Sequence, residues 1–251
     1  MNLKKKLSLD EVTLGSWITI PHPAIPEIMS NAGFDWLVID LEHSSITIRE
    51  AEDLIRVVDI CGKSPLVRLT SNDPDQIKRV MDSGAHGIIV PNITSIQEVE
   101  KSFASLHYPP LGKRGVGLAR AQKYGSGFDE YLNWQEEGPV LIVQIENKVA
   151  IENLDEIFSS GLIDAFIIGP YDLSASMGIP GQFEHPDFLK SVDSIIDSAK
   201  KNSIPSGIHI VEPDLLQLDS SIKKGHTFIA YSLDIRILDT LSRQAINSIK
   251  I

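Results

Sequence analysis

The sequence predicts an α/β protein, a (β/α)8 barrel formed as a single domain by residues 1–251. Three observations lead to this prediction. Eight short apolar runs alternate with helical patterns, as parallel strands alternate with their covering helices. A glycine recurs just before several of the runs. The length of 251 residues and the 42% hydrophobic content suit one large barrel core.

The strand-like runs are short and rich in branched apolar residues, as expected for strands buried on both faces. They cover Ser16–Ile20, Asp35–Ile39, Pro65–Leu69, Gly87–Val90, Val140–Ile145, Asp164–Ile168, Ser206–Ile210 and Thr227–Tyr231. The segment between Ile145 and Asp164 has helical character. The other clear helical patterns are Thr47–Cys61, Asp73–Ser83, Ser95–Leu106, Pro186–Asn202, Asp214–Lys224 and the last helix, Asp234–Ile249.

A glycine marks the expected end of a helix before four of the runs. It occurs within Asn31–Asp35, Asp82–His86, Ser160–Asp164 and Lys224–Thr227. Glycine is favoured there because a helix often ends on a residue in the left-handed conformation. The recurrence in phase with the runs supports a repeated strand and helix unit.

The interval between the fourth and fifth runs is longer than the others. Connections of this length inside a compact domain are often lids or binding loops. The segment His107–Arg120 contains Gly112, Gly115 and Gly117, which could direct backbone N–H groups at an anion or simply form a flexible turn. The loops expected after the last two strands contain no glycine, which favours an unphosphorylated substrate.

Composition excludes several classes of protein. A net charge of −11 and a pI near 5.1, with no basic stripe, argue against nucleic-acid binding. The lone Cys61 excludes an internal disulfide and a cysteine zinc cluster. Lys4, Lys5 and Lys6 precede no apolar run of signal-peptide length, and no stretch is long enough to span a membrane. A cytoplasmic protein without a membrane partner is therefore expected.

Two carboxylates follow neighbouring strand runs. Glu146 comes directly after the fifth run, and Asp172 lies four residues beyond the sixth. Both would emerge at the carboxyl rim of a parallel sheet, where their repulsion requires a shared proton, a basic neighbour or a divalent cation. We favour the cation. Taken singly, Glu146 could be a helix-start acid and Asp172 a turn acid.

Other strand ends also carry polar groups. The second ends in Asp40-Leu-Glu-His43, where a carboxylate could fix the tautomer of an imidazole and make it a general base; a polar surface turn is the alternative. The third ends in Arg68, suited to a carboxylate or an enolate, or else to an ion pair with one of these acids. The fifth adds Gln144. Their joint occurrence favours an active site.

These residues stand in segments that resemble a known family. The chain is similar to the HpcH/HpaI aldolases, class II metal-dependent pyruvate aldolases typified by 4-hydroxy-2-oxo-heptanedioate aldolase, from about Gly15 to the last helix. The resemblance is carried by Ala32–His43, Val67-Arg68 with Asn72–Pro74, Tyr108–Gly117, Val143–Glu146 and Ile168–Ser174. It implies reversible cleavage of a 4-hydroxy-2-oxo acid into pyruvate and an aldehyde.

The resemblance also implies a role for individual residues. It implies that the last helix docks on a neighbouring subunit and that the subunits assemble as a homohexamer. The resemblance further implies a bound divalent metal ion, which would be Mg2+, Mn2+ or Co2+. By similarity, Glu146 and Asp172 ligate the metal, His43 held by Asp40 is the acid/base, Arg68 stabilises the enolate, Gln144 and the backbone at Gly169 and Pro170 bind substrate, and Asp82 serves a neighbouring subunit's site.

Some alternatives remain open. An aldolase using a lysine Schiff base is disfavoured, because no lysine lies in any run and Lys148 is expected to point outward. No nucleotide cofactor is expected. The rivals are a citramalyl or acyl-CoA type lyase, a 2-oxo acid decarboxylase and a catalytically silent binding protein. His209 stands where the heptanedioate enzymes usually have an apolar residue, and it could favour a hydroxylated or charged aldehyde or merely bond within the rim.

Overall fold

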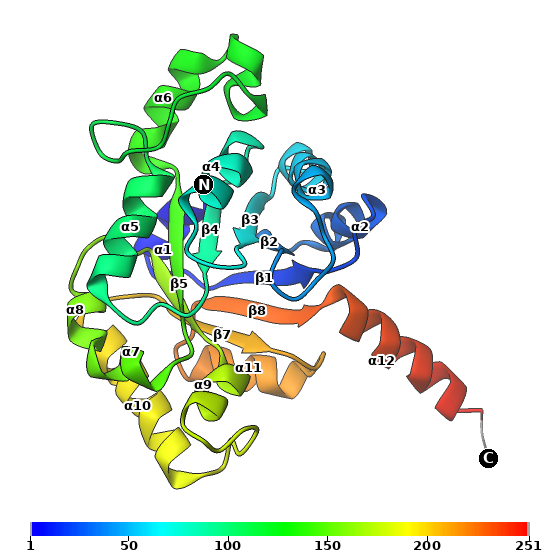
Figure 1. Cartoon of the computed structure of the whole chain (residues 1–251). Coiled ribbons are helices and arrows are strands. Elements are labelled where there is room, and N and C mark those ends of the chain that lie inside the picture. The colour runs from blue at the N-terminus through cyan, green and yellow to red at the C-terminus, as the bar shows by residue number, and fades with distance from the viewer. Residues whose placement is uncertain (1, 250–251) are drawn as a thin grey trace.

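The computed structural model describes residues 2–249 and forms a closed barrel of eight parallel strands. Each strand pairs with the next along the chain, and β8 closes the ring by pairing with β1. This confirms the predicted (β/α)8 fold (Figure 1). The strands are β1 (Thr13–Ile18), β2 (Trp36–Asp40), β3 (Ser64–Arg68), β4 (Gly87–Val90), β5 (Val140–Ile145), β6 (Ala165–Ile168), β7 (Ser206–Ile210) and β8 (Phe228–Leu233).

Helices follow the strands and form the outer layer. Their starts are specified locally: Thr47 and Glu50 make a reciprocal capping box, and the Asp73 and Asp214 side chains cap the helices that they precede. The helices are α1 (Leu3–Ser8), α2 (Ala24–Ala32), α3 (Ile48–Ile60), α4 (Pro74–Asp82), α5 (Ile96–Leu106), α6 (Phe128–Glu137), α7 (Lys148–Glu152), α8 (Leu154–Phe158), α9 (Pro170–Ser176), α10 (Pro186–Lys201), α11 (Leu215–Lys223) and α12 (Asp234–Asn247).

The recurring pre-strand glycines do end helices as predicted. Gly33, Gly84, Gly161 and Gly225 all have positive φ, between 69° and 110°. A side chain would strain the backbone in this region, so glycine lets the chain turn sharply from helix into strand.

The first strand is the main error in the predicted boundaries. It was expected at Ser16–Ile20 but runs over Thr13–Ile18. Thr13 and Leu14 pair with the start of β8, which extends the strand backwards. The N–H groups of Thr19 and Ile20 instead donate to Asp234 Oδ2, each at 2.8 Å, so the strand ends before them.

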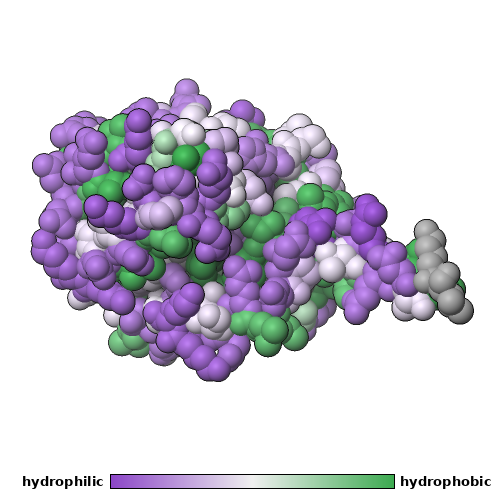
Figure 2. Space-filling model, turned by 90° about the horizontal axis from the view of Figure 1, so that it is seen from below, coloured by the Kyte–Doolittle hydropathy of each residue, from purple (hydrophilic) through white to green (hydrophobic). Residues whose placement is uncertain are grey.

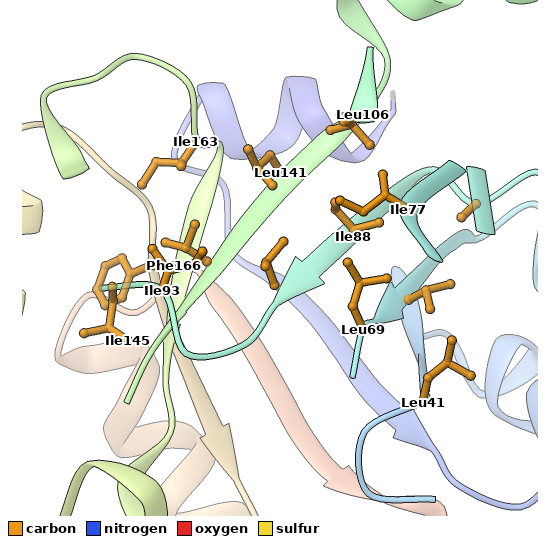
Figure 3. Close-up of a cluster of buried hydrophobic side chains, with 14 of the residues drawn as sticks. Leu41, Leu69, Ile77, Ile88, Ile93, Leu106, Leu141, Ile145, Ile163 and Phe166 are labelled. Carbon is orange, nitrogen blue, oxygen red and sulfur yellow. The ribbon is translucent and has the colours of Figure 1, made fainter. Parts of the chain in front are cut away.

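The barrel has an outer and an inner apolar core. The outer core lies between strands and helices, where Ile88 and Leu141 face Ile77 and Leu106 (Figure 3). The inner core fills the barrel with side chains such as Trp36 and Phe228, and Leu3 and Leu7 of α1 join it. Because the interior is filled, only the carboxyl rim is left for chemistry.

The long interval after α5 is folded against the outside of the barrel. It contains a 3-10 helix, η1 (Arg120–Gly125), and α6. Arg114 anchors it: this buried guanidinium lies 4.2 Å from the centroid of Tyr108 and donates to the Tyr131 hydroxyl at 2.7 Å. Gly117 lies beside Asp82.

Helix α12 leaves the body of the molecule. Asp234 fixes its start, and Arg236 binds Glu212 at 2.8 Å. Beyond that point it projects away from the barrel (Figures 1 and 2) with Leu238 and Leu241 each 60% exposed. Among residues 2–249, no helix is both long enough and apolar enough to cross a membrane.

Candidate active site

Strand alternation places the polar candidates inside the barrel mouth. Side chains two residues apart on a strand share a face, so a residue two places beyond an interior core residue also points inward. Asp40, Arg68 and Gln144 each lie two residues after an inner-core residue, namely Val38, Leu66 and Ile142. All three side chains therefore point into the barrel. Trp17 of β1 and His209 of β7 meet in the same layer, with ring centroids 5.3 Å apart.

One cavity of about 260 Å³ collects these residues at the carboxyl end of the strands. Larger hollows of about 510 and 640 Å³ lie outside the barrel, but no predicted site residue lines them. Among the described side chains of the long interval, none lines the 260 Å³ cavity. Every predicted site residue except Glu146 and Asp82 lines it: Asp40, His43, Arg68, Gln144, Gly169, Pro170, Asp172 and His209.

Asp40 and Arg68 form a two-pronged ion pair across adjacent strands. They are opposite each other in the register of β2 and β3, and Arg68 Nε and Nη2 donate to the two carboxylate oxygens at 2.9 and 2.6 Å. Asp40 is only 2% exposed. The guanidinium also lies 4.4 Å from the centroid of the Trp17 ring. Arg68 is therefore fixed in position by its neighbours.

The partner of Asp40 differs from the sequence prediction. Asp40 was expected to hold the His43 imidazole, but its Oδ1 accepts the backbone N–H of His43 at 3.3 Å while the carboxylate pairs with Arg68. The imidazole is 62% exposed, and its Nε2 lies 3.8 Å from Glu42 Oε2. Asp40 thus shapes the turn that carries His43, and the ring is left free at the cavity mouth.

Glu146 is a buried carboxylate beneath the cavity. It is 5% exposed; Oε1 accepts the Asn92 backbone N–H at 2.7 Å, and Oε2 accepts a hydrogen bond from Gln144 Nε2. Burial raises the pKa of Glu146 to about 7, and the negative charges of Glu42 and Asp172 act in the same direction. A side chain at Gly169 would overlap the Glu146 carboxylate, which explains the glycine there.

Asp172 lies in the first turn of α9, where Pro170 begins the helix after β6. It is exposed, and its negative charge also raises the pKa of Glu42, although burial is the larger cause and Arg68 opposes it. Glu42, Glu146 and Asp172 are therefore close enough for their negative charges to act on one another. The sequence prediction assigned no role to Glu42 or to Trp17.

These carboxylates fit a divalent cation. The negative charges of Glu42 and Asp172 lie near the buried Glu146 carboxylate and raise its pKa. Gln144 Oε1 is buried here without a hydrogen-bond partner, whereas Glu42 Oε2 lies 3.4 Å from Arg68 Nη1. Within residues 2–249, no three acidic, histidine or cysteine side chains are placed to enclose an ion by themselves. Two carboxylates alone would leave a hard cation with positions for water and substrate.

Asp82 lies apart from this cavity. It stands at the end of α4, with its Oδ1 3.6 Å from Arg114 Nη1 and buried without a hydrogen-bond partner. Lys148 is exposed at the start of α7, as expected.

The family model for HpcH/HpaI aldolase/citrate lyase matches residues 13–239, nearly the whole barrel. The chain belongs to this family. The assignment confirms the resemblance drawn from the sequence motifs and the enzyme class expected, a carbon–carbon lyase. It also makes the barrel mouth, where the motif residues converge, the family's expected place for chemistry.

Individual relatives in the HpcH/HpaI family are similar over almost their whole length. A hydroxypyruvate/pyruvate aldolase from Roseobacter denitrificans is 37% identical over 94% of this chain and 91% of its own. A 2-keto-3-deoxy-L-rhamnonate aldolase from Salmonella gallinarum is 33% identical over 92% and 86%. The crystal structure of an HpcH/HpaI aldolase from Desulfitobacterium hafniense superposes with a TM-score of 0.90 at 30% identity, covering 100% and 97% of the two chains.

Proposed function

We propose that this protein reversibly cleaves 4-hydroxy-2-oxo acids into pyruvate and an aldehyde. The observation that carries the proposal is a cavity lined by Asp172, the fixed Arg68 guanidinium and the His43 imidazole, with the buried Glu146 carboxylate close to Asp172. Cleavage of the bond between C3 and C4 leaves an electron pair that moves onto the 2-oxo oxygen. A site for this reaction needs positive charge at that oxygen and a base for the 4-hydroxyl proton.

The side chains of the cavity divide these tasks. Arg68, held by Asp40, would donate to the 2-oxo oxygen as negative charge develops there. His43 at the mouth would take the 4-hydroxyl proton, directly or through a water, and return it in the reverse reaction. Gln144 and the backbone following Gly169 and Pro170 would orient the 2-oxo acid. Because the ion pair with Asp40 fixes Arg68, its guanidinium would be a preorganised hydrogen-bond donor for the reaction.

The metal site follows from the same carboxylates. Glu146 and Asp172 would hold Mg2+, Mn2+ or Co2+, ions that accept oxygen ligands. When bound, such an ion supplies Lewis acidity for the charge on the 2-oxo oxygen. Gln144 would orient Glu146 through its amide hydrogen bond.

Self-association completes the proposal. We infer a homohexamer in which α12 docks on a neighbouring barrel, and Asp82 faces a neighbour's site rather than its own. The exposed Leu238 and Leu241 of α12 support this, because a projecting apolar helix face needs a cover. Leu215 and Leu216 of α11, 70% and 83% exposed, offer a matching apolar surface on a second copy.

The assembly can be tested by charge insertion. Leu238→Glu with Leu241→Glu should shift the mass measured by light scattering to smaller species, because two buried charges would be unpaired at the interface. The matched control is Gln244→Glu on the same helix, which should leave the mass unchanged. An unaltered mass in the double variant would refute docking through this face.

The reaction can be tested by pyruvate release. Racemic 4-hydroxy-2-oxo acids of different chain length are supplied with Mg2+, Mn2+ or Co2+, and pyruvate is detected with lactate dehydrogenase. Release should occur with at least one ion and stop on addition of EDTA. Tight metal binding without release from any substrate would favour the lyase or decarboxylase reaction; absence of metal binding as well would favour a silent binding protein.

A further inference from the structure

Two residues that line the cavity carry buried polar atoms that the protein leaves unpaired. Trp17 Nε1 and His209 Nε2 are both buried and have no hydrogen-bond partner. Their rings lie 5.3 Å apart, and both residues line the cavity. A buried polar atom without a partner costs stability, so such atoms are commonly kept for a ligand.

The neutral imidazole of His209 can accept a hydrogen bond through Nε2. Burial, together with the neighbouring charge of Arg68, lowers the pKa of His209 to about 4, so the ring is neutral at neutral pH. The Ser232 backbone acts in the opposite direction and raises the pKa. A neutral imidazole carries one proton and one lone pair, and Nε2, which is buried without a partner, is the nitrogen free to accept a hydrogen bond.

We infer that His209 accepts a hydrogen bond from a hydroxyl group of the substrate, with the Trp17 indole N–H as a donor beside it. This inference rests on the proposed aldol reaction and names the chemistry that the site selects. A carboxylate cannot donate to Nε2, and an unsubstituted alkyl chain would leave both nitrogens unpaired. His209 is thus a residue that determines specificity for hydroxylated substrates.

The position of His209 suits a small substrate. Arg68 lies over the Trp17 ring at 4.4 Å, and Trp17 contacts His209, so the three side chains are contiguous. A molecule held by Arg68 through its 2-oxo group therefore has His209 within reach. The hydroxyl could come from a 3-hydroxy-2-oxo acid or from a hydroxylated aldehyde.

A condensation assay distinguishes these two sources. One arm compares hydroxypyruvate with pyruvate, and the other compares glycolaldehyde with acetaldehyde, each as a ratio of kcat/KM. The wild-type protein should prefer the hydroxylated compound about 10-fold in at least one arm, since one buried hydrogen bond is at stake. In His209→Phe that ratio should fall to about one, and His209→Gln, which keeps an acceptor, should restore part of it.

Controls separate this role from structure and from the reaction itself. His107→Phe changes another buried histidine, whose ring contacts the Phe103 carbonyl, and should leave both ratios unchanged. Calorimetric titration with hydroxypyruvate and pyruvate in the presence of Mn2+ gives a second readout, independent of turnover. Equal ratios in wild type and His209→Phe in both arms would overturn the inference alone. Absence of condensation with every pair in the wild type would overturn the proposed reaction, and the inference with it.

Discussion

Replacing Glu146 by glutamine, or Asp172 by asparagine, is expected to lower kcat/KM for metal-dependent pyruvate release by more than about 10³-fold. Each change removes one of the two charges that would hold the ion, and with it the positive charge needed at the 2-oxo oxygen. Isosteric amides keep the shape of the site. The measurement is pyruvate release, together with Mn2+ affinity by calorimetry.

Stability should respond differently from activity. Glu146 is buried among Glu42 and Asp172, so its negative charge opposes folding in the metal-free protein. The metal-free Glu146→Gln protein should therefore unfold at the same temperature as the wild type or a higher one. Asp193→Asn, an exposed acid on α10, is the matched control and should change neither activity nor metal affinity. A Glu146→Gln protein that keeps both Mn2+ binding and turnover would exclude this residue as a ligand.

The sequence pattern predicted the barrel because its signal is local. The alternation of apolar runs with capped helices can be recognised without knowing which residues pair across the structure. The same is true of the glycine at each sharp turn from helix into strand. The limits of β1 could not be found this way, because Thr19 and Ile20 are withdrawn from the strand by Asp234, near the other end of the chain.

The site was predictable in its members but less so in its contacts. Polar residues at strand ends converge in any parallel barrel, and Asp40, Arg68 and Gln144 accordingly line one cavity. That Asp40 pairs with Arg68 depends on the register between β2 and β3, which the linear sequence does not show. The sequence prediction missed Trp17 because an inward-pointing residue at the end of a strand cannot be distinguished from a core residue by sequence alone.

The Asp40 and Arg68 pair gives the second large effect, on both stability and activity. Arg68→Met removes the charge but keeps much of the side-chain volume, which leaves Asp40 buried without its partner. Breaking a buried pair on one side costs about 3–5 kcal/mol, measurable by urea unfolding. Turnover should also fall about 10²–10³-fold, because a donor to the developing charge is lost.

The double variant separates these two roles of Arg68. Adding Asp40→Asn to Arg68→Met removes the unpaired charge, and the asparagine oxygen can still accept the backbone N–H groups of Glu42 and His43. Much of the lost stability should return, because a neutral pair carries a smaller burial penalty. Activity should stay low, since no guanidinium faces the substrate. If the double variant regained activity along with stability, Arg68 would be a structural residue, and the charge on the 2-oxo oxygen would have to be met by other groups of the cavity.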